Sequence, residues 1–157
     1  MNNQIQAAIK EVEKFNNSIK ETLTAKGISN TGEAARSLFV EHGKDFVQSI
    51  GIFYIEFLDT GRGPGNPPPF KPILEWAMRK TGQNANDSWG LAVYVRDKIA
   101  KLGTEIFRNN NEGLQISKKI VTLRKELRGA LLESTIVTVK QRLDRFKKQH
   151  IKNKYNI

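Results

Sequence analysis

Apolar residues recur at helical spacing near the start of the chain. They follow one another at steps of four, three, three, four and four residues, which places them on one face of a helix. These residues are Ile5, Ile9, Val12, Phe15, Ile19 and Leu23. Gly27 comes next and is typical of a helix C-terminal cap. The pattern predicts a helix over residues 3–26, whose apolar face either packs on the same domain or forms an oligomer interface.

The pattern then changes to shorter elements. A short helix is expected to begin at residues 31–33, with Thr31 or Ser29 as its N-cap. Two strand-like runs, 38–41 and 46–50, flank the turn at 42–45 and predict an antiparallel β-hairpin. The aromatic run 52–58 is compatible with a strand or a helix, because short apolar runs do not distinguish the two. We expect a short helix there, leading into the next loop.

Two further helices are expected in the middle of the chain. Pro72 suits the first turn of one helix, and Gly82 suits its C-terminal cap. Asp87 or Ser88 is expected to cap the next helix, which Gly103 ends. Trp89 and Tyr94 of the second helix are expected to reinforce packing against Trp76 of the first.

The C-terminal part is again helical in pattern. Residues 109–113 have the composition of a linker. Beyond them one apolar stripe comprises Ile116, Ile120, Leu123, Leu127, Ala130 and Leu131, and a second comprises Ile136, Val139, Leu143 and Phe146. Gly129 or the β-branched run 135–139 would allow a bend or a split between them.

These elements predict an α+β fold. A small antiparallel β-sheet is packed with helices, between a long N-terminal helix and extended basic C-terminal helices. The expected domains are residues 1–112, with the sheet and the N-terminal helix, and residues 113–157, a basic helical extension. A chain of 157 residues is long enough to bury a core without metal or disulfide staples.

Charge is concentrated at the C-terminal end. Residues 1–116 hold 14 basic and 13 acidic side chains, whereas residues 117–157 hold 12 basic and 3 acidic ones. The formal net charge of +10 therefore comes almost entirely from the second segment. Such asymmetry favours contact with a polyanion or an acidic protein surface. The candidate DNA- or partner-facing residues are Lys118, Lys119, Arg124, Lys125, Arg128, Lys140, Arg142, Arg145, Lys147 and Lys148.

Composition removes several classes of chemistry. There is no cysteine, which excludes disulfides, thiolate metal sites and a cysteine nucleophile. Two histidines, His42 and His150, leave little for a metal cluster or a His-based triad. No signal peptide or long apolar segment is visible. We therefore expect neither a catalytic residue nor a cofactor, and no membrane partner.

The most unusual stretch is the loop Gly61-Arg62-Gly63-Pro64-Gly65-Asn66-Pro67-Pro68-Pro69-Phe70. Glycine permits close backbone approach, and proline stiffens the path that follows. The loop does not match a phosphate-binding fingerprint, because it lacks the Gly-Lys-Ser/Thr ending and the dinucleotide spacing. A rigid structural or interface loop is the favoured interpretation. The candidate protein-interface residues are Gly61, Arg62, Gly63, Pro64, Gly65, Pro68 and Phe70.

The order of motifs in the central third resembles that of a known family. An aromatic helix at 53–58 runs into Gly61-Arg62-Gly63-Pro64, a Pro-Pro-Pro-Phe segment, and then Pro72-Ile73-Leu74-Glu75-Trp76. The run 92–104, ending in Leu102-Gly103-Thr104, follows in the same order. Over residues 31–104 the chain resembles the tail-completion or head–tail joining proteins of tailed double-stranded DNA bacteriophages.

The resemblance implies a non-enzymatic structural virion protein with an α+β fold. Such proteins form homo-oligomeric rings at the head–tail connector, the neck or the top of the tail, around the channel that DNA crosses during ejection. It implies contacts with neighbouring connector, portal-associated or tail proteins, with genomic DNA in the channel, and synthesis in the host bacterial cytoplasm. The alternative is a sequence-neutral DNA-binding accessory protein that uses the basic C-terminal helices.

Overall fold

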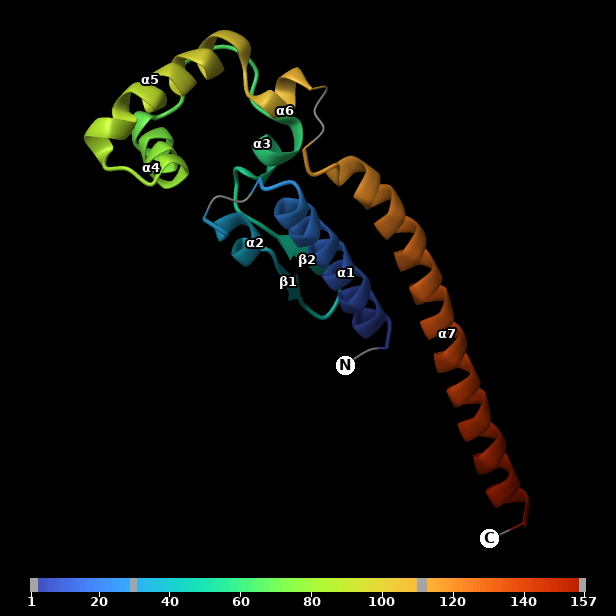
Figure 1. Ribbon diagram of the computed structural model, residues 1–157. Helices are drawn as coiled ribbons and strands as arrows, with labels where there is room; N and C mark the ends of the chain where they lie inside the picture. Colours follow the sequence, from blue (N-terminus) through green and yellow to red (C-terminus); the bar gives the residue numbers. More distant parts are fainter. Residues whose placement is uncertain (1–2, 29–30, 110–112, 156–157) are drawn as a thin grey trace. The chain divides into compact units, whose positions relative to one another are not determined.

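The computed structural model describes residues 3–28, 31–109 and 113–155, with side chains up to residue 147. These residues form helices and one two-stranded antiparallel sheet, which confirms the α+β class (Figure 1). In chain order the elements are α1 (Asn3–Ala25), α2 (Glu33–Ser37), β1 (Phe39–His42), β2 (Val47–Ile50), α3 (Ile55–Thr60), α4 (Phe70–Thr81), α5 (Ala85–Leu102), α6 (Glu105–Arg108) and α7 (Ile116–Tyr155).

The chain divides into two compact units, neither of which is continuous in sequence. Unit 1 comprises residues 1–20, 38–50 and 117–157, so it holds most of α1, the hairpin and nearly all of α7. Unit 2 comprises residues 21–37 and 51–116. The predicted boundary between residues 112 and 113 falls beside residues 110–112, which lie outside the described part of the chain, and it stays a prediction.

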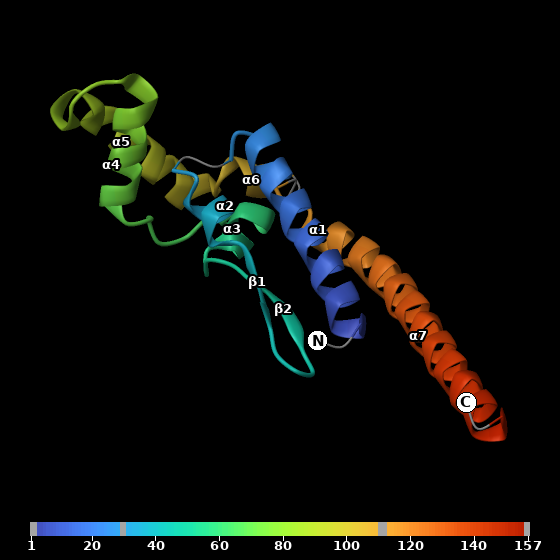
Figure 2. The same cartoon turned by 90° about the horizontal axis from the view of Figure 1, so that it is seen from below.

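The hairpin of unit 1 forms where the sequence predicts it. Phe39 pairs with Ile50 and His42 with Val47, and the Gly43 N–H donates to the Phe46 carbonyl at 2.9 Å to close the turn. Figure 2 shows this hairpin beside α1. The Ser49 hydroxyl donates to Asn16 Oδ1 on α1, which links the exposed β2 position to a buried residue of the helix.

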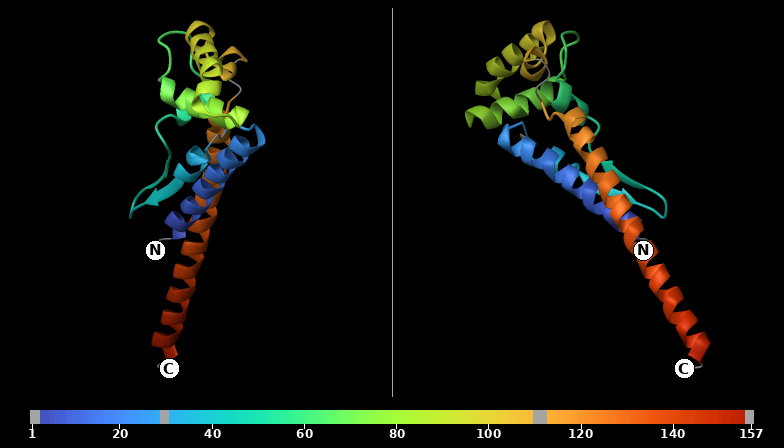
Figure 3. Two further views of the ribbon diagram at one scale, coloured as in Figure 1. Left: turned by 60° about the vertical axis from the view of Figure 1, so that its left-hand side comes forward. Right: turned by 90° about the vertical axis from the view of Figure 1, so that its right-hand side faces the viewer.

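Helices α1 and α7 run antiparallel within unit 1 (Figure 3). Asn3 Nδ2 lies 3.4 Å from Thr138 Oγ1, and Lys119 Nζ donates to the Ser18 carbonyl at 3.0 Å near the other end of the pairing. The first apolar stripe of α7 is half-buried throughout. The helix continues unbroken through Gly129, so the split that the sequence allowed does not occur.

Unit 2 contains a helical hairpin made by α4 and α5. Ala77 and Ala92 are fully buried, and such small side chains let the two helices approach closely. Gly82 ends α4 in the left-handed conformation with φ of 70°, as its position predicts. The buried Ser88 hydroxyl of α5 lies 2.9 Å from the Thr81 hydroxyl of α4, so two polar groups in the seam satisfy each other.

Three sequence expectations for unit 2 need correction. The cap of α5 is Asn84 rather than Asp87 or Ser88: its side chain accepts from the backbone N–H of Asp87 at 3.1 Å. Helix α3 begins at Ile55, after the first residues of the aromatic run. The α4 partner of the Trp89 ring in α5 is Phe70 rather than Trp76: the two rings meet edge-to-face at 6.1 Å between centroids, and Trp89 is 56% exposed.

Candidate functional site

The first half of the Gly61–Phe70 loop is a tightly packed corner of unit 2. Gly61 is buried with φ of 74°, in the region that favours glycine. A Cβ there would collide with the backbone nitrogen of Phe107 in α6, and would lie 2.7 Å from the Thr104 hydroxyl. Gly61 is therefore required by both its backbone angle and its neighbours.

Two hydrogen bonds join this corner to the end of α5. The Arg62 N–H donates to Thr104 Oγ1 at 2.9 Å, and the Thr104 N–H donates to the Arg62 carbonyl at 2.8 Å. Gly103 precedes Thr104 in the chain and has a φ of 77°. A Cβ there would be 2.7 Å from the Arg62 carbonyl oxygen. We call residues 61–63 and 103–107 the glycine clasp. It unites two motifs that stand far apart in the sequence.

The second half of the loop is held at its base and exposed at its tip. The Gly65 N–H donates to the Ala100 carbonyl at 2.9 Å, and Arg96 Nε donates to the Pro68 carbonyl at 3.1 Å. Residues 64–67 are exposed. Of the candidate interface residues, Pro64 and Gly65 are thus open to a neighbour, Arg62, Gly63, Pro68 and Phe70 are half-buried, and Gly61 is inside the clasp.

Asp59 of α3 holds the segment that leads into α7. The Asp59 carbonyl accepts from the Gly113 N–H at 3.1 Å, and Asp59 Oδ1 accepts from the Ile116 N–H at 3.0 Å. Asp59 therefore satisfies an N–H in the first turn of α7, a role that a neighbouring cap residue usually takes. The composition of residues 109–113 indicated a linker, yet Gly113 is buried against Leu58 and Asp59. No local signal predicts this contact.

The basic candidates of α7 are mostly exposed. Lys119 differs: it is half-buried and donates to the Ser18 carbonyl. The side chain of Lys148 lies outside the part that the structure describes. The exposed cations are Lys118, Arg124, Lys125, Arg128, Lys140, Arg142, Arg145 and Lys147.

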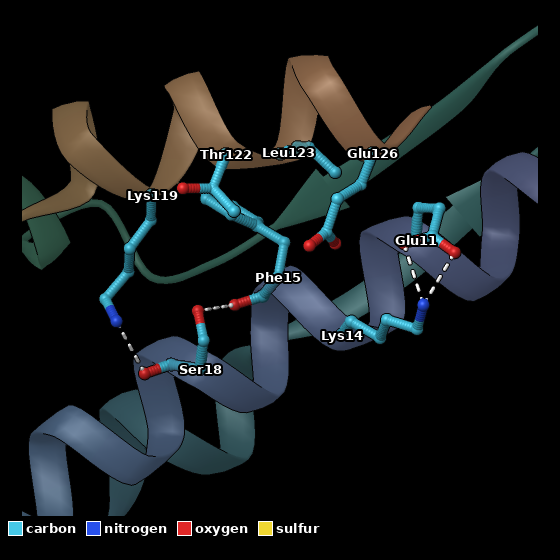
Figure 4. A pocket seen from close by; sticks show the side chains of 8 residues that line it. All are labelled: Glu11, Lys14, Phe15, Ser18, Lys119, Thr122, Leu123 and Glu126. Carbon is cyan, nitrogen blue, oxygen red and sulfur yellow. Dashed lines mark hydrogen bonds and ion pairs between the residues drawn. The ribbon is translucent and has the colours of Figure 1, made fainter. Parts of the chain in front are cut away.

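Unit 1 contains an open cavity of about 400 Å³ between α1 and α7 (Figure 4). The buried Glu11 carboxylate accepts from Lys14 Nζ at 2.8 and 3.0 Å in its wall. This hydrogen bond is the main cause that raises the Lys14 pKa above its ordinary value, against a smaller opposing effect of burial. The two opposite charges of this pair compensate each other in the cavity wall. Sequence reasoning did not identify this cavity, because its walls lie more than one hundred residues apart.

A second cavity, of about 430 Å³, lies in unit 2 beside Tyr54 and Glu33. The Tyr54 hydroxyl donates to Glu33 Oε2 at 3.4 Å. Burial, followed by the charge of Glu33, raises the Tyr54 pKa above its ordinary value. The phenol is therefore held protonated, and acts here as a hydrogen-bond donor.

Helix α7 also carries a second, exposed apolar stripe. The side chains of Leu132, Ile136, Val139 and Leu143 are all exposed, and so is the ring of Phe146. In contrast, the first stripe of the same helix is half-buried. The sequence predicted both stripes, the second without Leu132, but it did not distinguish their environments.

Within residues 3–28, 31–109 and 113–155, no group of three or more His, Asp or Glu side chains is arranged to hold a metal ion. No helix in the described part of the chain has the length and apolar character to cross a bilayer. In comparisons with known proteins, no family model, no curated protein and no solved structure matches the chain.

Proposed function

We propose that this protein is a structural virion component of a tailed bacteriophage. It assembles as a homo-oligomeric ring at the head–tail connector, neck or tail top, around the channel that DNA crosses. The observation that carries the proposal is the ordered set of motifs over residues 31–104. Two of them, Gly61-Arg62-Gly63 and Gly103-Thr104, are in direct contact in the glycine clasp, so these residues act together rather than as independent short matches.

A ring follows from contacts between unlike surfaces of neighbouring copies. The exposed loop tip at residues 64–67 suits such a contact, because hydrogen bonds at Gly65 and Pro68 fasten the loop to helix α5. A pre-ordered loop loses little conformational entropy when it binds. In this proposal the loop tip of one subunit contacts the next subunit or an adjoining virion protein.

Localisation in the particle tests this function directly. Purified virions of the phage that encodes the chain are imaged by electron microscopy, and the density at the neck and tail top is compared with unit 1 and unit 2. A ring of this chain at either place is the expected result. Complete, infectious particles that contain no copy of it would contradict the proposal.

Loop-tip variants separate the ring contact from folding. Pro64→Ser combined with Pro67→Ser changes exposed prolines and is expected to reduce incorporation into particles. The matched control is Gln83→Ser, which changes an exposed loop residue between α4 and α5. Equal incorporation of both variants would show that the loop tip does not form the proposed contact.

Sequence-neutral DNA binding is the second candidate, and the exposed cations of α7 favour it. Phosphate contacts by Lys and Arg release counterions, so the binding constant should fall steeply as salt rises. A fluorescence titration of the isolated protein with duplex DNA at several salt concentrations measures this slope. Tight binding with a steep slope would favour the accessory role. Absence of binding at low salt would exclude it.

A further inference from the structure

The exposed stripe of α7 has the spacing of a helix-pairing seam. From Leu132 the apolar positions advance by four, three and four residues to Leu143. This is the a/d repeat of coiled coils, in which each apolar side chain inserts between residues of a facing helix. The exposed fractions are 65% for Leu132, 47% for Ile136, 49% for Val139 and 52% for Leu143. We call these four residues the α7 seam.

The α7 seam does not face α1. Ser134 and Thr138 are half-buried, and Thr138 lies within hydrogen-bond distance of Asn3. Ile136 lies two residues from each of them, which is about 200° around a helix of 3.6 residues per turn. The seam therefore points away from the helix that covers the first stripe.

Cations line both edges of the α7 seam. Lys140 follows the d residue Val139 and Arg142 precedes the a residue Leu143, while Lys147 follows Phe146 one turn further on. All three side chains are exposed. Glu133 is the acidic side chain at an equivalent edge position. Edge positions select the partner of a helix through charge.

This charge pattern argues against a parallel pair of α7 helices from two copies of the chain. In a parallel pair of α7 helices, Arg142 of one chain would face Lys147 of the other, and like charges at these positions are unfavourable. A partner with carboxylates at its edges would instead pair with Lys140, Arg142 and Lys147. Apolar complementarity and charge complementarity then select the same partner.

We propose that the α7 seam docks an acidic amphipathic helix of a neighbouring protein. That helix carries an apolar stripe of the same spacing, with Asp and Glu at both edges. The inference rests on the proposed function, which places the chain among neighbouring virion proteins. It adds the class of partner that the C-terminal helix binds. It assigns α7 to protein rather than to the DNA of the channel.

The test uses the full-length protein and a synthetic probe. The probe is a helix of about three heptads with Ile at a, Leu at d and Glu at e and g, so that its own charges prevent self-pairing. Isothermal titration calorimetry is expected to detect binding to the wild type. Ile136→Gln with Leu143→Gln should weaken it at least about tenfold, the loss expected when central apolar anchors are removed.

A matched control is available in the adjacent residue. Val137 is 47% exposed, as is Ile136, but it lies outside the α7 seam. Val137→Gln should therefore leave probe binding unchanged. Lys140→Glu with Arg142→Glu and Lys147→Glu should abolish binding of the acidic probe, and circular dichroism should show that α7 remains helical in every variant.

Three results would overturn the inference. The first is absence of probe binding to the wild type. The second is a dimer in analytical ultracentrifugation that Ile136→Gln with Leu143→Gln converts to monomer, since a second copy would then cover the seam. The third is binding to anionic lipid vesicles that the same double variant abolishes. None of these results depends on where the protein lies in a particle, so failure here is distinguishable from failure of the proposed function.

Discussion

The Thr104 hydroxyl accepts a hydrogen bond from the backbone N–H of Arg62 at 2.9 Å, across 42 residues of chain. The same hydroxyl lies at 3.5 Å from the N–H of Phe107, at the start of α6. One side chain thus caps a helix and fixes the Gly/Pro loop. The Thr104 hydroxyl oxygen therefore takes part both in a local helix cap and in a contact between distant parts of unit 2.

Replacing Gly61 with alanine should severely destabilise unit 2. The new Cβ would collide with the Phe107 backbone at a residue with φ of 74°. Strain and overpacking together should cost about 2–4 kcal/mol in the free energy of unfolding, measured by urea titration. Gly90→Ala is the control, because its Cβ would enter open space within helix α5. Equal stability of the two variants would mean that the clasp is not tight.

Replacing Thr104 with valine removes the hydroxyl but keeps the shape of the side chain. The Arg62 N–H then loses its acceptor and α6 loses its cap. We expect a loss of about 1–2 kcal/mol in the free energy of unfolding. Thr104→Ser retains the hydroxyl and should recover most of the stability. A serine variant as unstable as the valine variant would assign the effect to the methyl group instead.

Gly129→Ala tests the continuity of α7. A Cβ at Gly129 meets nothing within 4 Å, and the residue lies inside the helix. Alanine should therefore stabilise the protein by about 0.5–1 kcal/mol, because glycine loses more backbone entropy in a helix. Thermal unfolding followed by circular dichroism measures the change. Destabilisation by alanine would indicate that the chain bends at this residue.

Alkaline pH should destabilise the fold through Lys14 and Tyr54. The pKa of each group is raised in the folded state, by the Glu11 hydrogen bond for Lys14 and by burial for Tyr54. Their contributions are therefore complete below the unfolded pKa values of about 10 and are lost as pH rises through the folded ones. Urea midpoints measured from pH 8 to 11 should fall.

Variants assign that pH dependence to its groups. Glu11→Gln removes the main cause of the Lys14 shift, and Tyr54→Phe removes the phenol. Each should flatten the decline in the urea midpoint above about pH 10. Lys10→Gln changes an exposed lysine of the same helix and serves as the control. An unchanged decline in both test variants would show that other groups determine the alkaline limit.

The regular elements were predictable because local periodicity encodes them. The stripe from Ile5 to Leu23 specifies α1, and the two strand-like runs with their turn specify the hairpin. Caps were less certain, since several residues with the same capping chemistry stand close together. Asn84 caps α5, although Asp87 and Ser88 offer equivalent groups.

The candidate site was predictable only in outline. The Gly/Pro loop and the basic residues could be found from composition, but the Thr104 and Asp59 contacts join residues 42 and 57 positions apart. The exposure of the α7 seam also depends on which face α1 covers, and hydrophobic spacing does not contain that information. The role of the loop as an interface remains a prediction.

Asp59 receives the N–H groups of both Gly113 and Ile116, so the chain leaves α3 and returns to the same residue. An excursion whose two ends coincide has the geometry of an inserted cassette. Such a segment can be lengthened, shortened or exchanged without moving the points where it joins its host.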